Sequence, residues 1–182
     1  WNTETGYFSI PPSPNIPNYV TSLIYNGMCL LEGTNLSEGR GTDTPFLLFG
    51  APWLNGYKLT SILNKLDLPG IKFEYSMFKP VRITGKADWP KYRDEICQGV
   101  RIRVLDDNKI DPIKMAVHII EETRALHPHE FIFLETNFID KLYGSEILKS
   151  NILSNKSLET LFISWQEDKV EFSKIKEKYL LY

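Results

Sequence analysis

The feature that most constrains this chain is a polar, glycine-rich stretch, Leu31 to Trp53, that lies between two apolar segments. Its sequence is LEGTNLSEGRGTDTPFLLFGAPW. The polar residues follow neither the 3.6-residue period of an amphipathic helix nor the 2.0-residue period of a half-buried strand. Residues 29–31 and 46–49 are apolar, so we expect a polar loop whose two ends are anchored in a core. Three glycines let its backbone turn with positive φ or approach another group closely: Gly33, Gly39 and Gly41.

The stretch carries two carboxylates and one guanidinium within nine residues, namely Glu32, Glu38 and Arg40. One interpretation is a structural ion pair that fixes the loop, with the glycines serving as turn residues. The other is a binding site for a polyhydroxylated ligand, because short side chains with hydrogen-bonding groups surround the charges. These side chains are Thr34, Asn35, Ser37 and Thr42.

The same stretch resembles a known family. EGTNLSEGRGT, followed by PF and GAPW, is similar to the C-terminal half of the NamZ/YbbC-type exo-β-N-acetylmuramidases. The resemblance continues outside the loop and spans essentially the whole chain. It extends to PPSPN (residues 11–15), CQGVRI (97–102), YGSEILK (143–149) and KYLLY (178–182). Asp43 stands where the family pattern more often has Thr.

This resemblance implies a two-domain protein that releases terminal N-acetylmuramic acid from peptidoglycan fragments. Its partners would be an N-terminal Rossmann-like domain of the same protein and a muropeptide or another sugar that contains N-acetylmuramic acid. The family also implies that the protein is exported, as a periplasmic protein, a lipoprotein or a secreted protein. Because the chain begins at Trp1 without an initiator Met, we expect it to be part of a longer protein.

The chemistry of that sugar suggests roles for the loop residues. The lactyl ether of N-acetylmuramic acid carries a carboxylate, which Arg40 can meet with a planar, bidentate fork. Trp53 can offer an apolar face to a sugar ring, although a role in the core is an equal alternative. Glu32 and Glu38 are the candidate catalytic carboxyl groups in this chain, since glycoside hydrolysis usually needs two. We expect the essential acid on the N-terminal half and the domain alone to be inactive.

Composition excludes several other classes of function. The chain has 182 residues, 42% of them hydrophobic, which is enough for one domain with a real core. A formal charge of −2 without a basic stripe argues against nucleic acid, and no apolar run is long enough for a membrane span. We expect no metal site, because the two neighbouring histidines, His127 and His129, are separated by a proline. No cofactor is expected either, since both common phosphate-binding glycine motifs are absent.

The expected fold is α/β or α+β: a small mixed sheet covered by helices, a long C-terminal helix, and a proline-rich N-terminal arm. Residues 1–18 carry four prolines and form either a linker or an arm whose aromatic residues, Trp1, Tyr7 and Phe8, line a cleft. Residues 19–182 form the single domain. Cys29 and Cys97 each begin an expected strand, where they form either two free thiols, which we favour slightly, or a bridge.

Local patterns predict the elements of that domain. The run 19–25 is ambiguous between helix and strand, Gly27 turns the chain, and 28–32 is expected as a buried strand that leads into the polar loop. Further strands are expected at 71–75, 81–84, 100–105 and 131–133. Helices are expected at 57–66 with Asn55 as N-cap, at 112–126 with Asp111 as N-cap, and at 137–142, 145–152 and 157–179. The last should cover a core with one apolar stripe: Leu158, Leu161, Phe162, Trp165, Phe172, Ile175 and Tyr179.

Overall fold

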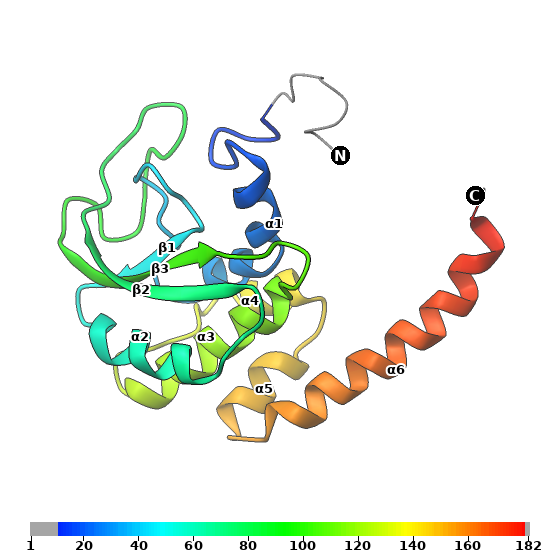
Figure 1. Cartoon of the computed structure of the whole chain (residues 1–182). Coiled ribbons are helices and arrows are strands. Elements are labelled where there is room, and N and C mark those ends of the chain that lie inside the picture. Colours follow the sequence, from blue (N-terminus) through cyan, green and yellow to red (C-terminus); the bar gives the residue numbers. More distant parts are fainter. Residues whose placement is uncertain (1–10, 181–182) are drawn as a thin grey trace.

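The computed structural model describes residues 11–180, in which a three-stranded sheet is combined with helices (Figure 1). The strands are β1 (Leu48–Ala51), β2 (Ile71–Phe78) and β3 (Cys97–Val104). The α-helices are α1 (Tyr19–Met28), α2 (Gly56–Lys65), α3 (Pro112–Leu126), α4 (Phe138–Tyr143), α5 (Ile147–Leu153) and α6 (Leu158–Lys176). Two 3₁₀ helices, η1 (Cys29–Gly33) and η2 (Glu177–Tyr179), extend α1 and α6. The expected combination of a small sheet, covering helices and a long C-terminal helix is confirmed.

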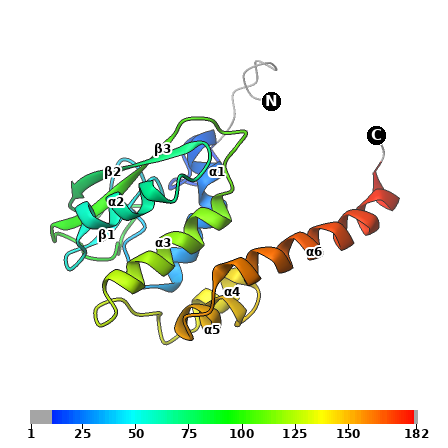
Figure 2. The same cartoon turned by 60° about the horizontal axis from the view of Figure 1, so that its bottom comes forward.

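The sheet has the order β1-β3-β2, and both pairings are antiparallel, so it is not the mixed sheet that the sequence suggested. Its register places Phe73 opposite Ile102. Both side chains are buried in the core beneath α2 and α3, which lie on one face of the sheet in both views (Figures 1 and 2). All four residues of β1 are buried, so this strand lacks the alternation of polar and apolar residues that identifies a strand in a sequence.

Side-chain caps explain where several of the predicted helices begin. The Asn55 side chain accepts a hydrogen bond from Lys58 N at 3.0 Å, and Asp111 accepts one from Lys114 N at 3.0 Å. Each cap satisfies a backbone N–H that has no partner in the first turn of its helix. The predictions of α2 and α3 are therefore confirmed within one or two residues at each end.

The segment before the polar loop differs from the prediction. Residues 28–32 are not a strand, because α1 continues through Gly27 to Met28 and then tightens into η1. Ile24, Met28 and Leu31 are fully buried at helical spacing across this segment. Gly27 does not turn the chain: it lies inside α1, where a Cβ would collide with the Pro112 carbonyl group of α3. The glycine therefore permits a close helix contact.

Two other expected strands are also absent within residues 11–180. The segment 81–84 lies in a long loop between β2 and β3, in which only one isolated bridge forms, between Ile83 and Ala87. The segment 131–133 makes a single bridge, Phe133 to Thr34. Here the side chain of Asn35 accepts a hydrogen bond from Ile132 N. This backbone N–H is therefore not available for hydrogen bonding to a neighbouring strand.

The stripe of α6 covers the core only over the first part of the helix. Leu158 and Leu161 are buried, whereas Phe172 is 63% exposed and Tyr179 is 77% exposed. Figures 1 and 2 show α6 extending away from the rest of the domain. The expectation that the whole stripe covers a core within this chain is therefore wrong.

The N-terminal segment reaches toward the loop between β2 and β3. Asn15 is buried, and its side-chain amide donates a hydrogen bond to Lys86 O at 2.6 Å. The aromatic residues expected to line a cleft, Trp1, Tyr7 and Phe8, lie outside the described residues. Among residues 11–180, no helix is both long and apolar enough to cross a membrane.

Candidate functional site

The polar loop begins directly after η1 and returns to the core at β1. Its flanks are anchored as the sequence suggests, because Leu31, Phe46 and Phe49 are fully buried. A pair of backbone hydrogen bonds between Ser37 and Gly50, of 2.8 and 3.0 Å, ties the middle of the loop to β1. The loop is therefore held at its ends and at its centre.

Glu32, Glu38 and Arg40 form one network with a lysine from a distant segment. Arg40 Nη2 lies 3.2 Å from Glu32 Oε1, and Arg40 Nε lies 3.4 Å from Glu38 Oε1. Lys91 Nζ lies 3.1 Å from the second carboxylate oxygen of Glu38, Oε2. Glu38 is thus placed between two cations, and its side chain is only 5% exposed.

Lys91 joins this network to the loop backbone. Its Nζ donates hydrogen bonds to the carbonyl oxygens of Leu31 and Leu36, at 3.1 and 2.9 Å. Below the network, the guanidinium of Arg40 lies over the Phe46 ring, 5.1 Å from its centroid. The ring of Tyr25 in turn packs edge-on against Phe46 at 4.8 Å. These contacts give the guanidinium a fixed position.

The three hydroxyl side chains predicted to bind a ligand form hydrogen bonds with the backbone of their own loop. Thr34 Oγ1 donates to Leu31 O at 2.9 Å, and Thr42 Oγ1 donates to Gly39 O at 2.6 Å. Ser37 Oγ accepts a hydrogen bond from Gly39 N at 3.3 Å. Thr34 and Ser37 are buried, so within this domain these two hydroxyl groups shape the loop.

Asn35 and Trp53 lie on another side of the loop. The Asn35 side chain donates to Glu130 O at 2.8 Å and accepts from Ile132 N at 3.0 Å, which fixes the loop to the segment after α3. Trp53 Nε1 donates to the Tyr92 hydroxyl at 3.0 Å, and that hydroxyl donates to Asn35 O at 2.7 Å. The Trp53 ring also packs edge-on against His127, 5.4 Å away.

Two tyrosines beside the network have shifted pKa values, chiefly because they are buried. Burial raises the pKa of Tyr25, the Glu32 carboxylate raises it further, and the Arg40 guanidinium partly offsets the rise. Burial also raises the pKa of Tyr92, against the effect of the hydrogen bond from Trp53. Both phenols therefore act as neutral hydrogen-bonding groups at neutral pH.

Among the loop's own members of the charged network, Arg40 and Glu32 keep the most contact with solvent, and Lys91 from the neighbouring loop is 27% exposed. The Arg40 side chain is 30% exposed and that of Glu32 is 22% exposed. The geometry therefore divides the predicted residues: Glu32 and Arg40 reach the surface, whereas Glu38, Thr34 and Ser37 lie beneath it. In the part of the chain that the structure covers, no three His, Cys, Asp or Glu side chains are grouped so that they could hold a metal ion.

The loop between β2 and β3 lies beside this site. Val81 N donates a hydrogen bond to Gly41 O at 2.9 Å, and a Cβ added to Gly41 would lie 2.9 Å from Pro90 Cγ. Next to Pro90, Trp89 is 82% exposed, with the Arg93 guanidinium 5.4 Å from its ring centroid. An exposed aromatic ring thus stands one residue from the contact with Gly41.

Sequence reasoning missed Lys91 and Tyr92 as part of this site. Both come from a loop far along the chain, and no local pattern links them to the glycine-rich stretch. The one available signal is that two adjacent residues, a lysine and a tyrosine, follow Pro90 in the segment that bears Trp89. Tyr25 was recognised only as part of an apolar run.

Comparison with known proteins matches this chain to one family. The family model for "Exo-beta-N-acetylmuramidase NamZ, C-terminal" matches residues 23–182. The peptidoglycan beta-N-acetylmuramidase NamZ of Bacillus subtilis (strain 168) is 37% identical over 171 residues, which are 94% of this chain and 40% of that protein.

Two solved structures of DUF1343 family proteins from Bacteroides fragilis NCTC 9343 are also similar. One has a TM-score of 0.87 and 28% sequence identity. The match covers 99% of this chain and 47% of the Bacteroides protein. The other has a TM-score of 0.72 and 29% sequence identity. The match covers 100% of this chain and 46% of that second Bacteroides protein. This chain spans less than half of each relative. It belongs to the NamZ exo-β-N-acetylmuramidase family, whose C-terminal domain it represents.

Proposed function

We propose that this chain is the C-terminal part of an exo-β-N-acetylmuramidase that releases terminal N-acetylmuramic acid from peptidoglycan fragments, and that its polar loop lines a cleft between two domains. The observation that carries the proposal is the partly exposed Glu32–Arg40 pair, whose position is held by the buried Glu38 carboxylate between Arg40 and Lys91. A charged pair that is fixed on its inner side and open on its outer side is suited to an anionic, hydroxylated ligand.

In this proposal Arg40 binds the lactyl carboxylate of N-acetylmuramic acid. A planar guanidinium recognises a carboxylate through two parallel hydrogen bonds, and its position is set here by Glu38 and the Phe46 ring. Glu38 and Lys91 act as positioning residues, because Glu38 is nearly sealed from solvent and both of its oxygens lie beside cations.

Glu32 is the better candidate of the two carboxylates for contact with substrate, since its side chain is more exposed than that of Glu38. Glycoside hydrolysis usually requires two carboxyl groups on either side of the scissile bond. We assign at least one of them, the essential acid, to the N-terminal domain, which the length of the relatives supports. Trp89, exposed beside the contact with Gly41, contributes an aromatic face at the rim of the cleft.

The test is hydrolysis of a chromogenic N-acetylmuramide by the full-length protein and its variants. Arg40→Ala should raise KM by roughly 10- to 100-fold, the loss expected for a charge-assisted bidentate contact. Arg40→Lys should recover only part of the loss, because a lysine keeps the charge without the fork. Glu32→Gln should reduce kcat/KM.

The chain offers a matched control in a second ion pair, between Arg103 and Glu74 on the exposed face of the sheet, at 3.0 Å. Arg103→Ala and Glu74→Gln should leave hydrolysis unchanged. If folded Arg40→Lys and Glu32→Gln proteins keep the wild-type kcat/KM, the loop is not part of the active site.

A non-catalytic sugar-binding module is the second candidate, favoured by the fact that Glu38 is already shared between two cations. It predicts that the full-length protein binds N-acetylmuramic acid, measured by calorimetry, without hydrolysing the chromogenic substrate. An active wild-type enzyme excludes this candidate.

A further inference from the structure

The free part of α6 carries an apolar face that nothing in the described chain covers. Phe172 is 63% exposed, Ile175 is 50% exposed and Tyr179 is 77% exposed. At 100° per residue, these three side chains continue the stripe that Leu161 and Trp165 present to the rest of the domain. The stripe therefore runs on past the point where the helix leaves the domain.

A helix segment of this length gains little stability in water from its own propensity. The part beyond Trp165 is about three turns long, and isolated helices shorter than about 12–15 residues are marginal in water. Helices in proteins gain most of their stability by packing an apolar face. The stripe is thus the face through which this segment is stabilised.

The position of α6 also agrees with a protein that is much longer than this chain. The Bacteroides fragilis protein with a TM-score of 0.87 is matched over 99% of this chain, which includes nearly all of α6. More than half of that protein lies outside the match. A comparable share of the Bacillus subtilis relative also lies outside its match.

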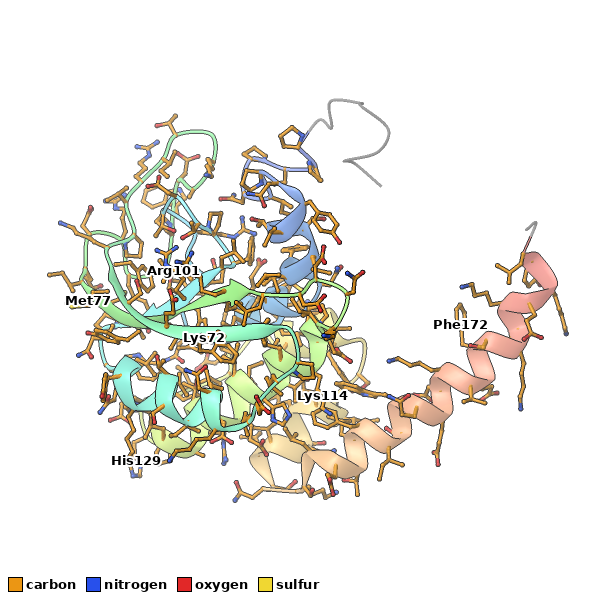
Figure 3. The ribbon with its side chains drawn as sticks, in the orientation of Figure 1. Lys72, Met77, Arg101, Lys114, His129 and Phe172 are labelled. Atoms are coloured by element: carbon orange, nitrogen blue, oxygen red, sulfur yellow. The ribbon has the colours of Figure 1, made fainter. Side chains whose placement is uncertain are left out.

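The arrangement of the chain indicates where such additional sequence would lie. The described chain starts beside α1, on the side toward which the free part of α6 extends in both views (Figures 1 and 2). The labelled side chain of Phe172 lies on the side of α6 that faces α1 (Figure 3). A domain that precedes this chain would therefore be connected to it on the side toward which the free part of α6 extends.

The base of the helix provides a hollow in the same region. It has a volume of about 470 Å³ and lies between the start of α3, the end of α4 and α6. Its wall includes Tyr143 and Trp165, whose indole Nε1 donates a hydrogen bond to the tyrosine hydroxyl at 2.7 Å. The hollow continues the apolar stripe toward the body of the domain.

We propose that the apolar stripe formed by Phe172 and Ile175 of α6 and Tyr179 of η2 is the surface on which the N-terminal domain of the same protein docks. This inference rests on the proposed function only in taking the full-length protein to have two domains. The docked helix would then brace the two domains on either side of the cleft, and the partner surface would be apolar, because aromatic and aliphatic side chains dominate the stripe.

Hydrogen exchange of the full-length protein tests the proposal. Backbone amides of residues 170–179 should be protected in the wild-type monomer, since docking would bury this part of the helix. The double variant Phe172→Ser with Ile175→Ser should exchange at least about tenfold faster in this segment. Val170→Ser is the matched control, because Val170 is 58% exposed and lies on the opposite face of the same helix.

Two outcomes would overturn the proposal. In the first, residues 170–179 of the wild type exchange at the rate of an unfolded peptide, which would mean that no partner covers the stripe. Protection that appears only with a concentration-dependent dimer, measured by light scattering, would assign the stripe to a second copy. Hydrolysis of the chromogenic substrate is a separate readout, so a failure of docking and a failure of the proposed activity are distinguishable.

Discussion

Lys91 Nζ lies 3.1 Å from Oε2 of Glu38, a carboxylate whose side chain is only 5% exposed. The two residues come from different loops, and the lysine also donates hydrogen bonds to two carbonyl groups of the glycine-rich loop. This pair therefore connects the loop after β2 to the loop that carries Arg40. The arrangement of the candidate site depends on it.

Removing Lys91 should destabilise the protein strongly. In Lys91→Met the buried Glu38 carboxylate keeps only Arg40 as a charged partner, and breaking a buried pair costs about 3 kcal/mol or more. Urea unfolding at pH 7 measures this loss of free energy. Lys109→Met removes a lysine that pairs with Asp106 at the surface, and should change stability by less than about 0.5 kcal/mol. Equal losses in the two variants would show that the Lys91 pair is not structural.

Gly27→Ala should destabilise the protein even though alanine is the better helix former. Propensity favours alanine by about 1 kcal/mol, but its Cβ would collide with the Pro112 carbonyl group where α1 meets α3. Overpacking of this kind costs about 1–3 kcal/mol, so we expect a net loss in thermal unfolding. The neighbouring variant Asn26→Ala, at an exposed position, should unfold within about 0.5 kcal/mol of wild type.

Stability should fall as the solution is acidified through the range in which His118 titrates. Burial, with a smaller effect of Lys114, holds the pKa of His118 below its usual value of 6.5. The unfolded chain therefore binds a proton more readily than the folded one, so stability rises with pH across the interval between the two pKa values and is lost below 6.5.

Urea unfolding from pH 5 to 7.5 measures this dependence. His118→Gln should flatten the slope in that interval, whereas His129→Gln, at an exposed position, should leave the slope as it is in wild type. A slope that is unchanged in the His118 variant would assign the pH dependence to other groups.

The two cysteines should differ in reactivity. Both are free thiols in the structure, Cys29 partly exposed at the start of η1 and Cys97 fully buried in β3. Burial, with a smaller effect of Glu95, raises the pKa of Cys97 to about 12. At pH 8 iodoacetamide should therefore modify Cys29 slowly and leave Cys97 unmodified, as read by mass spectrometry. Both should react in urea, and prompt labelling of native Cys97 would contradict its burial.

Trp89→Ala should weaken substrate binding by the full-length enzyme. Loss of an aromatic face next to a sugar ring is worth about 1–2 kcal/mol, so KM for the chromogenic N-acetylmuramide should rise roughly fivefold to thirtyfold with little change in kcat. Trp89→Tyr should restore most of the affinity. Tyr57→Ala removes another exposed aromatic ring, 74% exposed on α2, and should not alter KM. If the Trp89 and Tyr57 variants have the same KM, Trp89 does not line the cleft.

Part of this molecule is encoded locally and is readable from the sequence. Asn55 and Asp111 mark the starts of α2 and α3 because a cap acts on a backbone N–H three residues away. The apolar flanks of the glycine-rich loop, such as Leu31 and Phe49, indicate that it is anchored in a core. The string EGTNLSEGRGT was sufficient for the family resemblance, which the comparisons confirm.

The tertiary structure decided what depends on distant partners. Lys91 reaches Glu38 only after the sheet has brought two loops together, and no local pattern encodes that contact. Residues 28–32 belong to the end of α1 and to η1, and Gly27, which in isolation resembles a turn residue, lies inside α1 where it contacts α3. The apolar stripe of α6 is plain in the sequence, but only the fold separates Leu161, which is buried in this domain, from Phe172, which is not. Periodicity specifies which face of a helix is apolar, whereas burial depends on what the rest of the chain places against that face.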